Sequence, residues 1–72
     1  MIKFYSHMVK PLRDEMQMTQ ESFAYVCGCG IRTIWHYEKN EPRRMKASVR
    51  DAMIRIMKRN GITVEQLTED KL

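Results

Sequence analysis

Residues 18–38 read MTQESFAYVCGCGIRTIWHYE, and this stretch decides the fold. Ala24 is a small residue that stands where one short helix would cross another at a steep angle, and Gly28 stands where the sharp connection between them needs a residue that tolerates positive φ. The apolar underside of the two helices would then be formed by Phe23, Ile34 and Tyr37. The spacing predicts a helix-turn-helix over about residues 19–39.

Local signals indicate the bounds of these two helices. Thr19 can cap the first of them, because its hydroxyl can accept a hydrogen bond from a backbone N–H that the first helical turn leaves free. We expect this helix over residues 20–27 and the next one over about residues 30–39.

A further helix should precede the pair and end near Gln17, because apolar residues recur every four positions at Met8, Leu12 and Met16. Its start has two alternatives. Either Ser6 caps it and Pro11 lies a full turn inside, or it begins at Lys10 with Pro11 at its first position and residues 1–5 extended.

A fourth helix should follow a basic loop over residues 40–46. Ser48 with Asp51 three residues later resembles a capping box that opens it, and Asn60-Gly61 would end it. One face of this helix is expected to be apolar through Val49, Ala52, Met53, Ile56 and Met57. Ile54 departs from that face and is a candidate for a dimer contact.

The tail over residues 61–72 is the least determined part of the sequence. Thr63 with Gln66 is expected to cap a last short helix that carries Val64 and Leu67. The tail could dock on a partner subunit, close its own core or stay loose. With it, the sequence predicts an all-α fold, a small bundle of four to five helices in a single domain over residues 1–72.

The charges are concentrated in one part of the chain. Thirteen Lys and Arg against nine Asp and Glu give a net charge of +4. From Arg32 to Arg59 there are nine basic and three acidic side chains, whereas the tail carries Glu65, Glu69 and Asp70 against Lys71 alone. A basic face beside an acidic tail suits DNA as a partner. A chain of 72 residues builds only a small core and often gains stability from a second copy, so we expect a homodimer.

Neither the cysteines nor the apolar residues indicate a metal site or a membrane segment. Cys27 and Cys29 are too close for an ordinary disulfide, and a metal site formed with His36 would lack a fourth ligand. We therefore expect no metal and no cofactor. Free thiols agree with a reducing compartment, and no apolar stretch of membrane length or cleavage site occurs, so we expect a cytoplasmic, nucleoid-associated protein of bacterial or phage origin.

The chain resembles the phage repressor and Cro-like domains, also called XRE-type (lambda-repressor-like) regulators. The residues that carry the resemblance are Leu12-Arg13, Met18-Thr19-Gln20, Ala24, Gly28, Thr33-Ile34 and Tyr37-Glu38. The likeness extends from about Leu12 to Arg44, roughly half of the chain. Three positions depart from the family pattern, namely Pro11, Cys29 and Asn40. Asn40 replaces the usual glycine and also tolerates the left-handed conformation that ends a helix.

The resemblance implies that the helix over residues 30–39 enters the major groove of DNA by its N-terminal end. With Ile34 and Tyr37 pointing inward, the outward residues are Gly30, Ile31, Arg32, Thr33, Trp35 and His36. Arg32 is the first choice for a base contact, because a guanidinium can donate twice to guanine O6 and N7; a phosphate contact is the alternative. Ile31 can pack on a thymine methyl group, and His36 can hydrogen-bond a base or a phosphate.

Other residues would hold the DNA backbone or the helices themselves. Gln20 and Thr33 reach phosphates in the family, and we expect Lys39, Arg43 and Arg44 to help. Trp35 either lies along the sugar-phosphate wall or folds back over the domain as a partly buried ring. Glu38 is expected to hold Arg13 in an ion pair that fixes the angle between helices, a solvated charge being the alternative. Ala24, Gly28 and Ile34 have structural roles.

These features predict a sequence-specific regulator of transcription. No Ser, His and acid set, glycine-rich phosphate loop or carboxylate pair at useful spacing can be assembled, so we expect no enzyme. The expected partner is double-stranded DNA, with a homodimer on an inverted-repeat operator acting as a repressor, often of its own gene, without a small-molecule ligand. The alternative is a protein-interaction module, such as an antitoxin or antirepressor, that uses the same fold.

Overall fold

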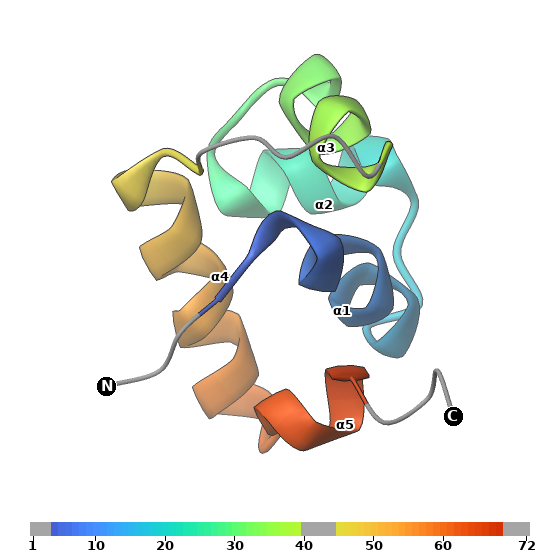
Figure 1. The fold of residues 1–72 in the computed structure, drawn as a ribbon. Helices are drawn as coiled ribbons and strands as arrows, with labels where there is room; N and C mark the ends of the chain where they lie inside the picture. The colour runs from blue at the N-terminus through green and yellow to red at the C-terminus, as the bar shows by residue number, and fades with distance from the viewer. Residues whose placement is uncertain (1–3, 40–44, 69–72) are drawn as a thin grey trace.

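The computed structural model of the protein describes residues 4–39 and 45–68, apart from the side chain of Thr68. This part of the chain is all-α, as predicted, and contains no strand. Its elements are the 3₁₀ turn η1 (Ser6–Met8) and the helices α1 (Val9–Glu15), α2 (Gln20–Cys27), α3 (Ile31–Glu38), α4 (Ala47–Asn60) and α5 (Val64–Thr68). Figure 1 shows α2 and α3 at one end of the molecule, α5 at the opposite end, and α4 running along one side between them.

The first helical segment differs from both predicted starts, because Ser6 is not a cap and the α-helix does not begin at Lys10. A 3₁₀ turn begins at Ser6 and α1 begins at Val9, so Pro11 is the third residue of the α-helix. There the missing N–H costs little, because the first four N–H groups of an α-helix have no partner within that helix. The helix ends at Glu15, two residues before the predicted Gln17. Gln17 has a φ of 56°, and this left-handed backbone conformation ends the helical segment.

The predicted boundaries of α2 are confirmed. The Thr19 Oγ1 accepts a hydrogen bond from the Ser22 N–H at 3.1 Å and so caps the helix. At the other end Gly28 adopts a φ of 74°, and the N–H of Cys29 donates to the carbonyl of Ala24 at 3.0 Å. This closure uses the conformational freedom of glycine to turn the chain sharply into α3. Gly30 and Lys39 flank α3, within one residue of the predicted bounds.

The predicted capping box of α4 is wrong. The helix begins at Ala47, so Ser48 and Asp51 both lie inside it, and the residue before it, Lys46, makes no side-chain cap. The start is set instead by a contact across the fold, since the N–H of Lys46 donates to the Tyr37 hydroxyl at 3.3 Å. The predicted end is confirmed, because Gly61 adopts a φ of 66° directly after Asn60.

The predicted cap of α5 is also confirmed. The Gln66 Oε1 accepts from the Thr63 N–H at 2.7 Å, and the Thr63 Oγ1 accepts from the Gln66 N–H at 3.3 Å. Leu67 is only 1% exposed and belongs to the hydrophobic core. Of the alternatives for the tail, residues 64–67 therefore close the core of their own chain, while residues 69–72 lie outside the described part.

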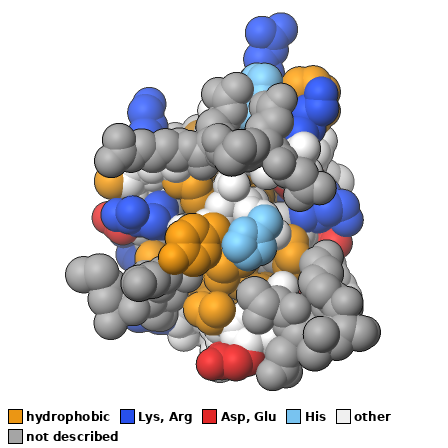
Figure 2. All heavy atoms as spheres, viewed as in Figure 1, with side chains coloured by type: hydrophobic (Ala, Val, Ile, Leu, Met, Phe, Trp, Pro, Cys, Tyr) orange, Lys and Arg blue, Asp and Glu red, His pale blue; other side chains and the backbone are white. Residues whose placement is uncertain are grey.

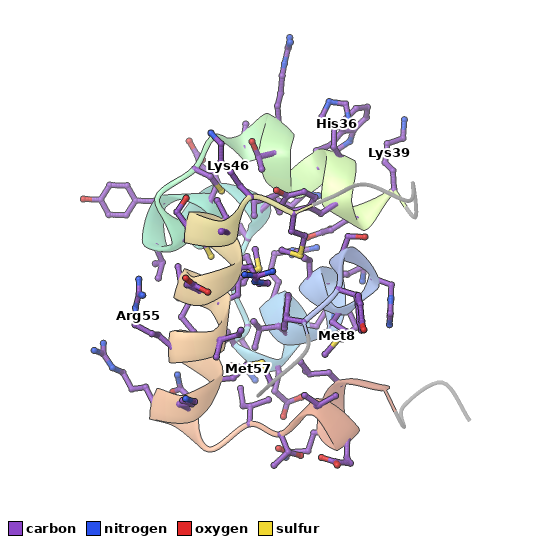
Figure 3. All side chains as sticks on the ribbon, turned by 60° about the vertical axis from the view of Figure 1, so that its left-hand side comes forward. Met8, His36, Lys39, Lys46, Arg55 and Met57 are labelled. Atoms are coloured by element: carbon purple, nitrogen blue, oxygen red, sulfur yellow. The ribbon has the colours of Figure 1, made fainter. Side chains whose placement is uncertain are left out.

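One hydrophobic core joins all the helices. Its buried residues are Phe4, Met8, Val9, Leu12, Phe23, Ala24, Cys27, Ile34, Tyr37, Val49, Met53, Met57 and Leu67. Met8 and Met57 point into the space between α1 and α4 (Figure 3). The predicted apolar face of α4 is confirmed, with Ile56 half-buried at its edge. Ile54, predicted to stand apart from this face, is also half-buried against the core, which weakens the expectation that it forms a dimer contact.

None of the helices in the described part of the chain is long and apolar enough to span a membrane.

Candidate nucleic-acid interface

The outward face of α3 carries the side chains that the sequence analysis assigned to DNA. Ile34 and Tyr37 are buried three residues apart, which turns the intervening positions of the helix outward. Ile31 is 48% exposed at the first position of α3, and Arg32 next to it is exposed as well. Thr33 and His36 are half-buried. Figure 3 shows His36 and Lys39 projecting from α3 at the end of the molecule.

The C-terminal half of this face is organised by Trp35. Its ring is 44% exposed, and the Lys39 ammonium lies 4.0 Å from the centroid of the ring, one helical turn further along. The edge of the neighbouring His36 ring meets Trp35 at a centroid distance of 5.2 Å. Trp35 is thus exposed and is not folded back over the domain as a partly buried ring, and the Lys39 ammonium packs against it.

A polar network at the end of α3 joins three helices. The predicted ion pair is present: the Nε and Nη2 of Arg13 donate to the two carboxylate oxygens of Glu38 at 2.7 and 3.0 Å. The Nη1 of Arg13 also donates to the carbonyl of Met18 at 2.9 Å. The side chains of Arg13 and Glu38 are only 14% and 7% exposed, so water screens their attraction weakly. The hydrogen bond to Glu38 raises the pKa of Arg13 above its ordinary value, despite partial burial.

Gln20 belongs to the same network, which the sequence analysis did not predict. Its Nε2 donates to the Glu38 Oε1 at 3.0 Å, so one carboxylate positions side chains from both α1 and α2. The sequence contained a signal for this contact, because Arg13, Gln20 and Glu38 are all among the residues that carry the resemblance to the Cro-like family. The second hydrogen of the amide nitrogen remains able to donate to a phosphate.

A groove runs between α3 and the start of α4. Lys46 is exposed at its edge, at the position before α4, and was not singled out from the sequence (Figure 3). The groove is lined by Gly28, Cys29, Gly30, Thr33, His36, Tyr37, Met45, Lys46, Ser48 and Val49. It therefore places a cation and polar side chains beside the outward face of α3. Arg43 and Arg44, the other predicted backbone contacts, and Asn40 lie outside the described residues.

The two cysteines pack as apolar residues. Burial raises the pKa of the Cys27 thiol to about 12 and also raises that of Cys29. Both thiols therefore stay protonated near neutral pH and are poor nucleophiles and poor metal ligands. Among the described residues, no three or more His, Cys, Asp or Glu side chains gather closely enough to hold a metal ion.

Comparisons of the chain with protein-family models, curated proteins and solved structures found no match.

Proposed function

We propose that this protein is a sequence-specific double-stranded DNA-binding regulator of transcription, of the phage repressor and Cro-like type. One observation carries the proposal. α3 presents Ile31 and Arg32 at its exposed N-terminal end, while Glu38 at its other end is tied to Arg13 of α1 and Gln20 of α2. A helix that reads bases must be both exposed and rigidly oriented, and α3 meets both conditions.

In the proposed complex the start of α3 enters the major groove. Arg32 donates two hydrogen bonds to the O6 and N7 atoms of a guanine, a contact that discriminates against other bases by about 1–3 kcal/mol. Ile31 packs on a thymine methyl group, and His36 reaches a base or phosphate one turn further along the same helix. Together these side chains determine sequence choice.

Affinity comes from the residues around α3. Gln20, Thr33, Trp35 and Lys39 contact the backbone, and Lys46 extends this set from the other side of the groove; Arg43 and Arg44 are proposed from the sequence alone. Each neutralised phosphate releases condensed counterions, so binding falls steeply as salt rises. The Lys39 charge is presented next to the Trp35 ring, whose face can lie along the sugar-phosphate wall.

The proposed biological role is repression by occupancy in the cytoplasm of a bacterium. A homodimer would place two copies of α3 about one turn of DNA apart on an inverted repeat. Such an operator overlapping a promoter would block polymerase, often at the regulator's own gene.

The test is selection of bound duplexes from a random DNA library at near-physiological salt, run in parallel with the wild-type protein and Arg32→Ala. We expect an inverted repeat with half-site centres about one helical turn apart. Arg32→Ala should lose the preference for one guanine in each half. If the protein keeps its helical content but enriches no DNA sequence from the library, the proposal is contradicted.

A second candidate function is a protein-interaction module such as an antitoxin or antirepressor. The observation that favours it lies on α2, where Tyr25 is 88% exposed and the adjacent Val26 is 48% exposed. Exposed tyrosine is typical of protein interfaces. Substituting Tyr25→Ser should leave DNA selection unchanged if Tyr25 lies outside the proposed DNA interface. If the wild-type protein enriches no DNA sequence, the exposed surface around Tyr25 would be the first place to look for a protein-binding site.

A further inference from the structure

We propose that the second half of α4 forms a second DNA-binding surface, which holds the phosphate backbone of a separate duplex without reading its sequence. This surface consists of Arg55, Lys58 and Arg59 and is called the α4 basic patch below. With one duplex on α3 and another on the patch, one protein would bridge two segments of DNA. The bridging rests on the proposed function for the first duplex, whereas binding at the patch does not.

The three cations share one face of α4 and form no ion pair within the part of the chain that the structure describes. Residues three and four positions apart are neighbours on a helix, and all three side chains are exposed. Within residues 4–39 and 45–68, no ion pair or hydrogen bond engages any of their side chains. Two other exposed cations are paired, since Lys10 lies 2.9 Å from Asp14 and Arg50 lies 3.8 Å from Asp51. Arg32, Lys39 and Lys46, which are proposed to face the first duplex, are also exposed and have no ion pair within the described residues.

Helix stability alone does not account for this arrangement. Lys58 and Arg59 lie in the last turn of α4, where positive charge is favoured by the helix dipole. Arg55 lies before that turn, so it gains little from the dipole; Lys58 and Arg59 repel it, and its one acidic neighbour on the helix is Asp51, four residues earlier, with which it forms no ion pair. Three like charges at this spacing, none of them ion-paired within the described residues, suit an external polyanion.

The patch lies away from the surface proposed to read DNA. α4 starts beside α3 and runs toward α5, and a helix rises about 1.5 Å per residue, so Arg59 lies about 20 Å beyond Lys46 along its axis. Figure 3 shows Arg55 projecting from the outer side of α4, whereas His36 and Lys39 project from α3. In the view of Figure 2, Lys and Arg side chains lie toward the edges of the molecule, and hydrophobic side chains with one histidine occupy the centre. A straight duplex on α3 would leave the patch free.

The chemistry of the surroundings favours DNA over an acidic protein. Protein interfaces need an apolar or aromatic centre, whereas phosphate contacts need only cations and polar groups. The exposed large hydrophobic residues of the described chain are Tyr5, Tyr25, Val26, Ile31 and Trp35, and none belongs to α4. The exposed neighbours of the patch on that helix are polar, namely Asp51 one turn before Arg55, which is acidic, and Asn60 after Arg59.

The experiment measures capture of a second duplex. A duplex with the selected operator is immobilised and loaded with protein, and a fluorescent duplex without the operator is then added at near-physiological salt. Wild-type protein should retain the fluorescent duplex. R55Q/R59Q should retain at least about fivefold less per bound protein, because phosphate contacts are lost, with less than about twofold change in affinity for the operator.

A matched control is K10Q/R50Q, which removes the same formal charge from two cations that already have acidic partners. It should retain the second duplex nearly as well as the wild type. Equal losses in the two variants would trace capture to net charge and overturn the proposal. Capture that is unaffected by R55Q/R59Q, as expected if the two α3 helices of a dimer hold the two duplexes, would overturn it too, as would operator-bound wild-type protein that captures nothing.

The proposed function and the patch can fail separately. Without an enriched operator the proposed function fails, and the same two variants are then compared for binding to an arbitrary duplex at low salt. Weaker binding of R55Q/R59Q than of K10Q/R50Q would still support the patch. Equal binding, or no binding by the wild type, would reject it.

Discussion

α3 and α4 are attached to the rest of the molecule by different forces. α3 is eight residues long and buries only Ile34 and Tyr37, but its last residue, Glu38, is hydrogen-bonded to α1 and α2. α4 is fourteen residues long and is held by four buried apolar side chains, Val49, Ala52, Met53 and Met57. Its polar link to α3 is the hydrogen bond from the Lys46 N–H to Tyr37.

Because of this difference, α4 should mainly determine the stability of the fold, and the contacts of Glu38 should mainly determine the orientation of α3. Burial of apolar surface is non-directional and scales with area, so α4 should contribute most to the free energy of unfolding. Hydrogen bonds depend on geometry, so the Glu38 network should determine how α3 is presented. Substitutions in the two regions should therefore differ in the ratio of lost stability to lost DNA affinity.

The largest effect on stability is expected for Met53→Ala. Met53 is fully buried in α4, and truncation of a buried methionine to alanine costs about 2–5 kcal/mol of unfolding free energy. Urea denaturation followed by circular dichroism measures this loss. Arg50→Ala, on the exposed side of the same helix, should change stability by less than about 0.5 kcal/mol. Similar losses in the two variants would refute the assignment of stability to the apolar face.

Glu38→Gln should cost less stability but more DNA affinity. A neutral amide cannot match two charge-assisted bonds from Arg13, and hydrogen bonds to charged groups contribute about 1.5–3 kcal/mol. Because Gln20 loses its position as well, operator affinity should fall beyond what the unfolded fraction explains. Lys10→Gln, which breaks an exposed ion pair, is the control and should cost less than about 1 kcal/mol. Wild-type operator affinity for Glu38→Gln would mean that the network does not orient α3.

Gly28→Ala tests the turn between α2 and α3. Gly28 has a φ of 74° and a Cβ there would meet nothing within 4 Å, so the cost is conformational, about 1–2 kcal/mol. Gly61→Ala, at a φ of 66° and equally open, should cost the same stability. Only Gly28→Ala should also weaken operator binding, because its turn positions α3. Gly30→Ala, where φ is −80°, should be nearly neutral in stability, and unequal losses at Gly28 and Gly61 would argue against a purely local cost.

The smallest effect concerns Cys27 and alkaline pH. Burial raises its pKa to about 12 in the folded protein, from an ordinary value of 9.0. Between these two values the folded state binds more protons than the unfolded state. The contribution of Cys27 to the free energy of unfolding is therefore fully present below pH 9.0 and declines as pH rises toward 12. Cys27→Ala should lower stability at neutral pH but show a shallower decline over that interval. Parallel pH profiles of unfolding free energy would contradict this.

Most predictions that depended on local chemistry agree with the structure, the capping box at Ser48 and Asp51 being the exception. Thr19 and Thr63 cap their helices, and Gly28 and Gly61 end the preceding ones, because a cap or a left-handed turn involves residues only a few positions apart. The buried faces of α3 and α4 followed from helical periodicity. The Arg13–Glu38 pair spans distant residues, and it could be predicted only through the family resemblance.

The amino-acid sequence by itself thus determined the helices, the caps of α2 and α5 and the apolar faces, because these depend on neighbours along the chain. Only the tertiary structure decided where α4 begins, since Tyr37 holds Lys46 and leaves Ser48 inside the helix. It also decided that Gln20 joins Glu38. Arg55 projects from the outer side of α4 and Lys39 from α3, although one basic stretch of sequence contains both residues. Their positions depend on how helices pack, because contacts between distant residues set the directions in which side chains at either end of a helix project.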